Sequence, residues 1–102
     1  IFSPKENLES LFALEVKGDS MIDAMVNEGD IVIMRATKDA NNGEMVAVWW
    51  DDQTTLKYFY REKNRVRLQP ANPNYQPIYI ENSEDFQIQG KVVAVIRQFK
   101  NA

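Results

Sequence analysis

The 102-residue chain contains no histidine and no cysteine. Without histidine, a Ser-His-Asp triad, a Cys-His dyad and a histidine-ligated zinc site are excluded. Without cysteine, disulfides, thiolate metal sites and thiol nucleophiles are excluded as well. Any acid–base chemistry of this chain must therefore come from Asp, Glu, Lys or Tyr side chains, and we predict no metal site and no cofactor.

Long apolar runs and an excess of positive charge are also missing. No stretch approaches the roughly 20 apolar residues that a membrane helix needs, and the charged start IFSPKENLES is not typical of a signal peptide. The net charge of −3 has the wrong sign for a domain that binds nucleic acid through its own surface. One basic cluster is interrupted by Glu62, and we interpret it as a solvated edge; its members are Arg61, Lys63, Arg65 and Arg67.

Short apolar segments separated by turn signals predict a mostly β fold of short strands, in one domain over residues 1–102. Turns at 41–43 (NNG) and 51–53 (DDQ) predict a hairpin over 44–60. Residues 72–77 (NPNYQP) are predicted to be an irregular loop, and Gly90 a bulge or bend. The predicted strands are LFALEVKG (11–18), IVIMR (31–35), EMVAVWW (44–50), TTLKYFY (54–60), RVRLQP (65–70), IYI (78–80) and FQIQGKVVAVIRQF (86–99).

The helical candidate is SMIDAMV, residues 20–26, of about two turns. Ser20 and Asp23 have the Ser-x-x-Asp spacing of a capping box, which would stabilise the helix by about 1 kcal/mol. The same position suits a nucleophile, because the free amides and positive dipole of a helix start resemble an oxyanion hole. Ser20 can be a nucleophile, rather than only a helix cap, if the chain holds a base that activates its hydroxyl.

Lys57 is the candidate base, because it lies within the apolar and aromatic strand segment TTLKYFY. Strand alternation places Lys57 on one face with Thr55 and Phe59. Burial there would lower the pKa of the amine from its ordinary value of about 10.4, and Thr55 would hydrogen-bond and orient it. The alternative is an edge lysine whose stem covers apolar surface and whose charge blocks aggregation.

Taken together, these segments resemble the C-terminal domain of the LexA-type repressors of the bacterial SOS response, a family of S24-type peptidases with a Ser-Lys dyad. The resemblance runs from about Phe12 to Arg97. It is carried by VKGDSMIDAMVNEGDIVIM, NNGEMVAVWWDDQTTLKYFYRE, RVRLQPANPNYQPI and the closing GKVVAVIR.

The resemblance implies a mostly β, signal-peptidase-like domain of short, strongly bent strands with one short helical turn after Ser20. It implies that Ser20 is the nucleophile, that neutral Lys57 is the general base and that Thr55 supports the lysine. Backbone amides around Ser20 and Met21 would hold the oxyanion. It further implies a cytoplasmic protein without cofactors that cleaves its own upstream Ala-Gly-type bond when a RecA filament on single-stranded DNA stimulates it.

The resemblance also implies a homodimer formed through the last strand, residues Val92–Phe99. The family's winged-helix domain, which binds operator DNA, and its Ala-Gly cleavage bond are not found in this sequence. We therefore expect a catalytic and dimerisation core. The alternatives are a UmuD- or phage-repressor-type relative, a signal-peptidase relative, or a non-catalytic dimerisation module with a capping Ser20 and an edge Lys57.

Overall fold

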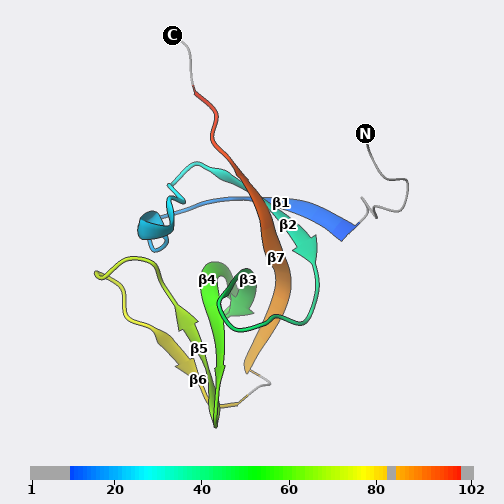
Figure 1. Cartoon of the computed structure of the whole chain (residues 1–102), viewed down its shortest axis with the longest axis vertical. Helices are drawn as coiled ribbons and strands as arrows, with labels where there is room; N and C mark the ends of the chain where they lie inside the picture. The colour runs from blue at the N-terminus through cyan, green and yellow to red at the C-terminus, as the bar shows by residue number, and fades with distance from the viewer. Residues whose placement is uncertain (1–9, 83–84, 100–102) are drawn as a thin grey trace.

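The computed structural model describes residues 10–82 and 85–99, and in these residues the chain forms one antiparallel sheet. The strand order is β1-β2-β7-β3-β4-β5-β6, so the last strand lies between β2 and β3 (Figure 1). The predicted mostly β fold is therefore confirmed. The strands are β1 (Leu11–Glu15), β2 (Ile31–Ala36), β3 (Glu44–Trp50), β4 (Gln53–Glu62), β5 (Arg65–Gln69), β6 (Ile78–Ile80) and β7 (Phe86–Ile96).

The predicted hairpin over 44–60 is formed by β3 and β4, and its turn has two residues. Asp51 and Asp52 have φ of 52° and 60°, between the paired residues Trp50 and Gln53. Positive φ at both positions is the signature of a type I′ turn, which matches the twist of the flanking strands. This turn sets the register that places Lys57 opposite Val46 of β3.

The predicted irregularity at Gly90 is also present in β7. Ala47 of β3 pairs with Gly90 and Val48 with Ile88, so one residue of β7 is extra, as in a β-bulge. A Cβ atom at Gly90 would lie 2.8 Å from the Arg35 carbonyl oxygen. A glycine is therefore required at this position, where β7 pairs with β2.

The helix predicted over residues 20–26 is wrong in length. The structure has only a three-residue 3₁₀ turn, η2 (Ile22–Ala24), which ends at Met25 with a left-handed φ of 64°. The amide of Asp23 donates to the Ala71 carbonyl at 2.7 Å, so a tertiary partner replaces an intrahelical one. No side chain caps this turn, and the capping-box interpretation of Ser20 and Asp23 is therefore wrong.

Two clusters of buried apolar side chains form the core. The cluster that positions the Ser20 loop includes Met21, which is 2 % exposed and packs beneath η2. Its buried members are Met21, Val26, Val32, Met34 and Ala47, and those of the other cluster are Val46, Val48, Phe59, Val66, Leu68, Ile80 and Ile88. Because β3 contributes to both clusters, the core joins the Ser20 loop to the sheet.

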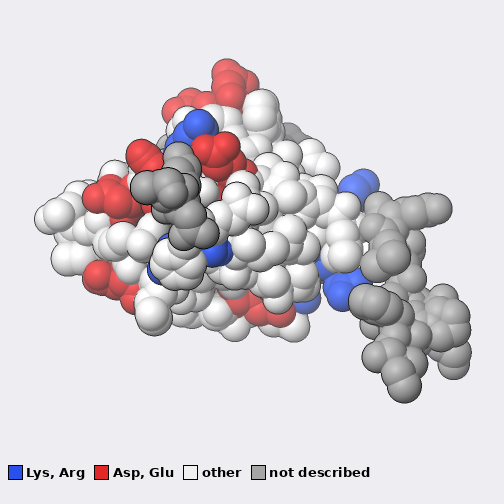
Figure 2. Space-filling model, turned by 90° about the horizontal axis from the view of Figure 1, so that it is seen from above, with Lys and Arg blue, Asp and Glu red and all other residues white. Residues whose placement is uncertain are grey.

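Two of the four cations in the basic cluster of β4 and β5 share one carboxylate. Glu62 accepts from Arg65 at 2.8 Å and from Arg67 at 2.9 Å. The same two guanidinium groups stack over Tyr79 and Tyr60, respectively. The face in Figure 2 shows scattered acidic and basic groups rather than a continuous basic surface. In the described residues, no helix has the length and apolarity that crossing a membrane demands.

Candidate active site

Ser20 and Lys57, far apart in the sequence, meet in the structure. Ser20 lies between β1 and η2, and Lys57 lies in the middle of β4. Lys57 Nζ is 3.0 Å from Ser20 Oγ, which is a hydrogen-bond distance. The Ser20 side chain therefore contacts a potential base and does not cap a helix.

The Lys57 side chain is buried, with 6 % of the residue exposed. Burial penalises the ammonium form and lowers the pKa of Lys57 from its ordinary value. Thr55, on the same face of β4, accepts a hydrogen bond from Nζ at 2.6 Å, and the Leu56 carbonyl accepts one at 3.1 Å. The expected burial of Lys57 and the expected contact with Thr55 are both present, and the edge-lysine interpretation is wrong.

The three partners of Lys57 Nζ suit a neutral amine. Such an amine has two N–H donors and one lone pair. An ammonium would donate to all three oxygens; in the neutral amine, the Leu56 carbonyl, which can only accept, and the Thr55 hydroxyl take the two donors. The lone pair is then left for the Ser20 hydroxyl, which is the arrangement in which a base removes the hydroxyl proton.

The Ser20 backbone is held by the loop between β5 and β6, which runs up to η2 (Figure 1). The Ala71 amide donates to the Ser20 carbonyl at 2.8 Å, and Asn72 Nδ2 donates to the Asp19 carbonyl at 2.9 Å. Tyr75 Oη donates to Asp19 Oδ1 at 2.6 Å. Sequence reasoning treated residues 72–77 only as an irregular loop, and nothing in its turn signals indicated this contact.

The amides proposed for an oxyanion hole are those of Ser20 and Met21. The following amides, of Ile22 and Asp23, donate to the carbonyls of Asp19 and Ala71. Among the hydrogen bonds formed within residues 10–82 and 85–99, none is donated by the Ser20 or Met21 amide. These two N–H groups are therefore the ones beside the nucleophile that remain available to a bound carbonyl oxygen.

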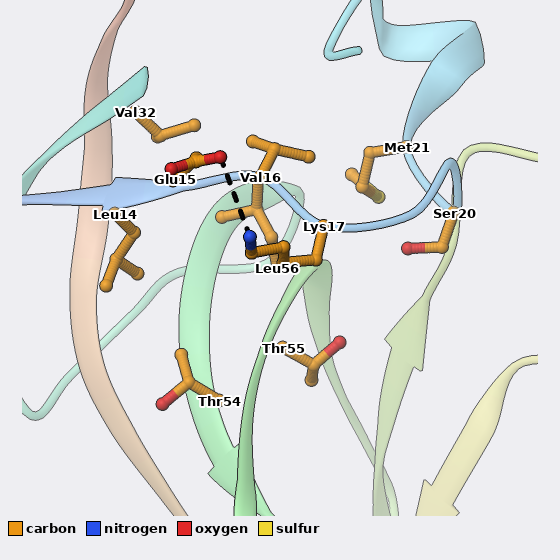
Figure 3. Close-up of a pocket in the computed structure, with 10 residues that line it drawn as sticks. All are labelled: Leu14, Glu15, Val16, Lys17, Ser20, Met21, Val32, Thr54, Thr55 and Leu56. Carbon is orange, nitrogen blue, oxygen red and sulfur yellow. Dashed lines mark ion pairs between the residues drawn. The ribbon is translucent and has the colours of Figure 1, made fainter. Parts of the chain in front are cut away.

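A cavity of about 160 Å³ opens beside Ser20, between the end of β1 and the start of β4 (Figure 3). Its rim carries an ion pair of 3.6 Å between Lys17 and Glu15. Its apolar lining suits small aliphatic side chains of a peptide next to the nucleophile. The lining side chains are Leu14, Glu15, Val16, Lys17, Ser20, Met21, Val32, Thr54, Thr55 and Leu56.

A second polar contact ties Arg97, the residue directly after β7, to the segment after η2. Arg97 Nε and Nη2 donate to Asp30 Oδ1 and Oδ2 at 2.9 and 2.8 Å, and Nη2 also donates to the Met25 carbonyl. The Arg97 hydrogen bonds, together with the Asn27 amide, lower the pKa of Asp30 from 3.8 to about 2. Sequence analysis used both residues in the resemblance but did not pair them.

The fold and this Ser-Lys contact define a class of protein. The family model of the S24-like peptidases matches residues 2–93, which is most of the chain. The chain therefore belongs to the S24-like peptidase family, as the sequence resemblance predicted.

The similar curated proteins are named LexA repressor. The chain is 52% identical over 97 residues to the one from Roseiflexus sp. (strain RS-1), covering 93% of this chain and 44% of that protein. It is 48% identical over 91 residues to the one from Desulfitobacterium hafniense, with coverages of 89% and 43%. It is 50% identical over 90 residues to the one from Geobacter sp. (strain M21), with coverages of 87% and 45%. The chain thus spans less than half the length of these relatives.

Proposed function

We propose that this chain is the self-cleaving serine peptidase and dimerisation domain of a LexA-type transcriptional repressor. The observation that carries the proposal is the 3.0 Å contact between Ser20 Oγ and the buried Lys57 Nζ. Self-cleavage of an upstream Ala-Gly-type bond fits the small apolar cavity beside Ser20. The dyad needs neither histidine nor a cofactor, in keeping with the composition.

In the first half of the reaction, Lys57 Nζ takes the proton of the Ser20 hydroxyl as Oγ attacks the carbonyl carbon of the scissile bond. The negative charge that develops on the carbonyl oxygen is stabilised by the Ser20 and Met21 amides. The intermediate then collapses, the C–N bond breaks, and Lys57 gives its proton to the leaving amine. The product of this half is an ester between Ser20 and the upstream fragment.

In the second half, a water molecule attacks the ester carbonyl and Lys57 takes one of its protons. The C–O bond to Ser20 breaks, and Lys57 returns that proton to Ser20 Oγ. The upstream fragment leaves with a new carboxyl group. Thr55 and the Leu56 carbonyl keep the amine in place through both halves.

The biological setting proposed here is the one that the resemblance to LexA-type repressors implies, and the relatives named LexA repressor support it. Cleavage would separate this domain from an upstream operator-binding domain and end repression, after stimulation by a RecA filament in the cytoplasm. The net charge of −3 agrees with DNA contact through another part of the protein.

Dimerisation is proposed to use β7. This strand pairs with β3 only through Phe86–Lys91, so in the described structure its remaining residues are paired along one edge only, with β2. That second half and the residues after it also expose apolar side chains, which are Val93, Val95 and Ile96 in β7 and Phe99 beyond it. An open edge next to exposed apolar residues suits pairing with a second copy across a two-fold axis.

The deciding experiment measures self-cleavage of the full-length gene product that contains this chain, by mass spectrometry from about pH 6 to 10.5, a range that includes lysine's reference pKa. We expect one cut upstream of Ser20, with a first-order rate that rises with pH as Lys57 loses its proton.

Ser20→Ala and Lys57→Ala are expected to reduce the rate by at least about 10⁴-fold, as loss of a nucleophile or its base does in other serine peptidases. Thr37→Val, at a half-buried residue directly after β2 whose hydroxyl contacts Asp39, is the control for fold and handling. A folded dimer that stays whole at every pH would contradict the proposal and favour the non-catalytic dimerisation module.

A further inference from the structure

Asn72 is a buried polar residue in the loop between β5 and β6, with 8 % of it exposed. We propose that Asn72 is a positioning residue, which orients the oxyanion-binding amide of Ser20 by holding the Asp19 carbonyl; this inference rests on the proposed function. Asn72 Nδ2 donates to that carbonyl at 2.9 Å. Burying an amide side chain costs free energy unless its polar atoms are paired, and here Nδ2 is paired with the carbonyl of the residue before the nucleophile.

The geometry of the peptide bond transmits the contact. In a trans peptide unit, the C=O of one residue and the N–H of the next point in opposite directions in one plane. No cis peptide bond occurs in the described residues, so fixing the Asp19 carbonyl fixes the direction of the Ser20 N–H. The Asp19 carbonyl also accepts from the Ile22 amide at 3.2 Å, which gives this peptide unit two donors.

The next peptide unit is held in the same way. The Ala71 amide donates to the Ser20 carbonyl at 2.8 Å, which fixes the direction of the Met21 N–H. The Ala71 carbonyl in turn accepts from the Asp23 amide at 2.7 Å. Residues 71 and 72 thus hold both peptide units whose N–H groups flank the nucleophile.

Asn72 is itself held at two further polar atoms. Its Oδ1 accepts from the Asn74 amide at 2.9 Å, and its carbonyl accepts from the Tyr75 amide at 3.1 Å. The side chain of Tyr75 then reaches back to Asp19 Oδ1 at 2.6 Å. The loop therefore contacts Asp19 at two points, through the buried side-chain amide of Asn72 and through the exposed hydroxyl of Tyr75.

The test measures self-cleavage of the full-length gene product against pH for Asn72→Asp and Asn72→Ala. Asn72→Asp keeps an oxygen for the Asn74 amide but removes the donor to Asp19, whereas Asn72→Ala removes both without adding charge. We expect the plateau rate at high pH to fall roughly 10- to 100-fold. In Asn72→Ala the midpoint of the pH profile should stay unchanged, because the variant adds no charge near Lys57.

Two further variants keep the test informative if the Asn72 variants fold poorly. Asn74→Ala, on the same loop, removes no hydrogen bond of Asp19 and should leave the plateau rate unchanged. Tyr75→Phe removes the exposed bond to Asp19 Oδ1 and should lower the plateau roughly 3- to 10-fold, the worth of one hydrogen bond.

Binding to this chain separates positioning from stability. A peptide boronic acid that ends in boroalanine forms a tetrahedral adduct with the serine, whose oxygen occupies the oxyanion site, whereas the matching peptide amide does not. In Asn72→Ala, which adds no charge beside the anionic adduct, we expect boronate affinity to fall by the same factor as the plateau rate, with amide affinity unchanged.

Equal plateau rates in wild type and folded Asn72 variants would overturn the inference, as would an equal loss of boronate and amide affinity. Failure of the wild type to cleave at any pH would instead overturn the proposed function and the positioning role with it.

Discussion

At the scale of single residues, the surroundings of Lys57 disfavour the charged ammonium form of its side chain. The amine is buried, its pKa is lowered by desolvation, and no carboxylate is among its hydrogen-bond partners in the described residues. A surface lysine carries no such cost, so the arrangement favours the neutral form that a general base requires.

Thr55→Val tests how far the lysine depends on its hydroxyl partner. The change removes the acceptor at 2.6 Å and leaves the size of the side chain almost unchanged. With one N–H unpaired, the amine is free to rotate away from Ser20, and we expect cleavage to slow roughly 10- to 100-fold. Thr55→Ser should retain most of the rate, and an unaltered rate in Thr55→Val would exclude the orienting role.

Lys57→Met tests the cost of the buried amine. The pKa of Lys57 is lower in the folded chain than in the unfolded chain, so the unfolded chain binds the proton more tightly. Below the folded pKa, the protonated amine therefore reduces the free energy of unfolding by its largest amount, compared with an uncharged side chain at the same position. We expect Lys57→Met to raise the free energy of unfolding at pH 7, measured in urea, while abolishing cleavage. The gain should shrink as the pH rises from the folded pKa toward about 10.4, where the amine is neutral in both states. A variant less stable than wild type at pH 7 would contradict this.

At the scale of elements, the Arg97–Asp30 contact joins the end of β7 to the segment that follows η2. Asp30 is 2 % exposed, and both of its oxygens accept from Arg97. The Met25 carbonyl, at the end of the 3₁₀ turn, accepts from the same guanidinium. The strand proposed for dimerisation is therefore tied directly to the turn that follows the nucleophile.

This contact predicts a specific acid dependence of stability. The folded pKa of Asp30 is lowered from 3.8 to about 2, so its contribution is fully present above about pH 4 and is lost as the pH falls through about 2. We expect Arg97→Gln to be less stable than wild type at pH 6 and to approach it by pH 2, in urea unfolding curves. Arg61→Gln, an exposed arginine of β4, is the control. A difference that persists undiminished at pH 2 would rule out Asp30 as its source.

At the scale of the whole molecule, the two halves of β7 pair with different strands. Phe86–Lys91 pairs with β3 inside the sheet, whereas the part beyond Lys91 pairs with β2 alone and exposes apolar side chains. Figure 1 shows this part of β7, in orange and red, running on past β3 and β4. The strand thus serves both the core of one chain and the proposed contact with a second copy.

Val93→Asp and Phe99→Asp test that contact, at residues 48% and 85% exposed. An acidic group there would be desolvated without a partner in the dimer, so we expect dimer dissociation constants at least about 10-fold higher. Analytical ultracentrifugation measures the effect. Tyr79→Asp, at an exposed residue of β6, should not change it, and the circular dichroism of all three should match wild type. Unchanged dissociation constants in both Val93→Asp and Phe99→Asp would place the dimer interface elsewhere.

Most of the strands and turns were predictable because they depend on local pattern. Alternating and β-branched segments gave β2 to β6 nearly to the residue, and the Asp51–Asp52 turn fixed the register of β3 and β4. The predicted helix over residues 20–26 failed because its amide and carbonyl groups bond to Ala71, a residue distant in sequence. Local propensity carries no information about such a partner.

The sequence by itself determined which chemistry was open to this protein. The lack of histidine and cysteine restricted acid–base chemistry to Asp, Glu, Lys and Tyr, and the setting of Lys57 in an apolar strand predicted its burial with Thr55 beside it. Only the tertiary structure decided that Ser20 Oγ meets that amine and that Asn72 holds the Asp19 carbonyl. These contacts join segments that are distant along the chain, and their distances are set by how the sheet twists and how the core packs. Composition and periodicity do not encode that geometry.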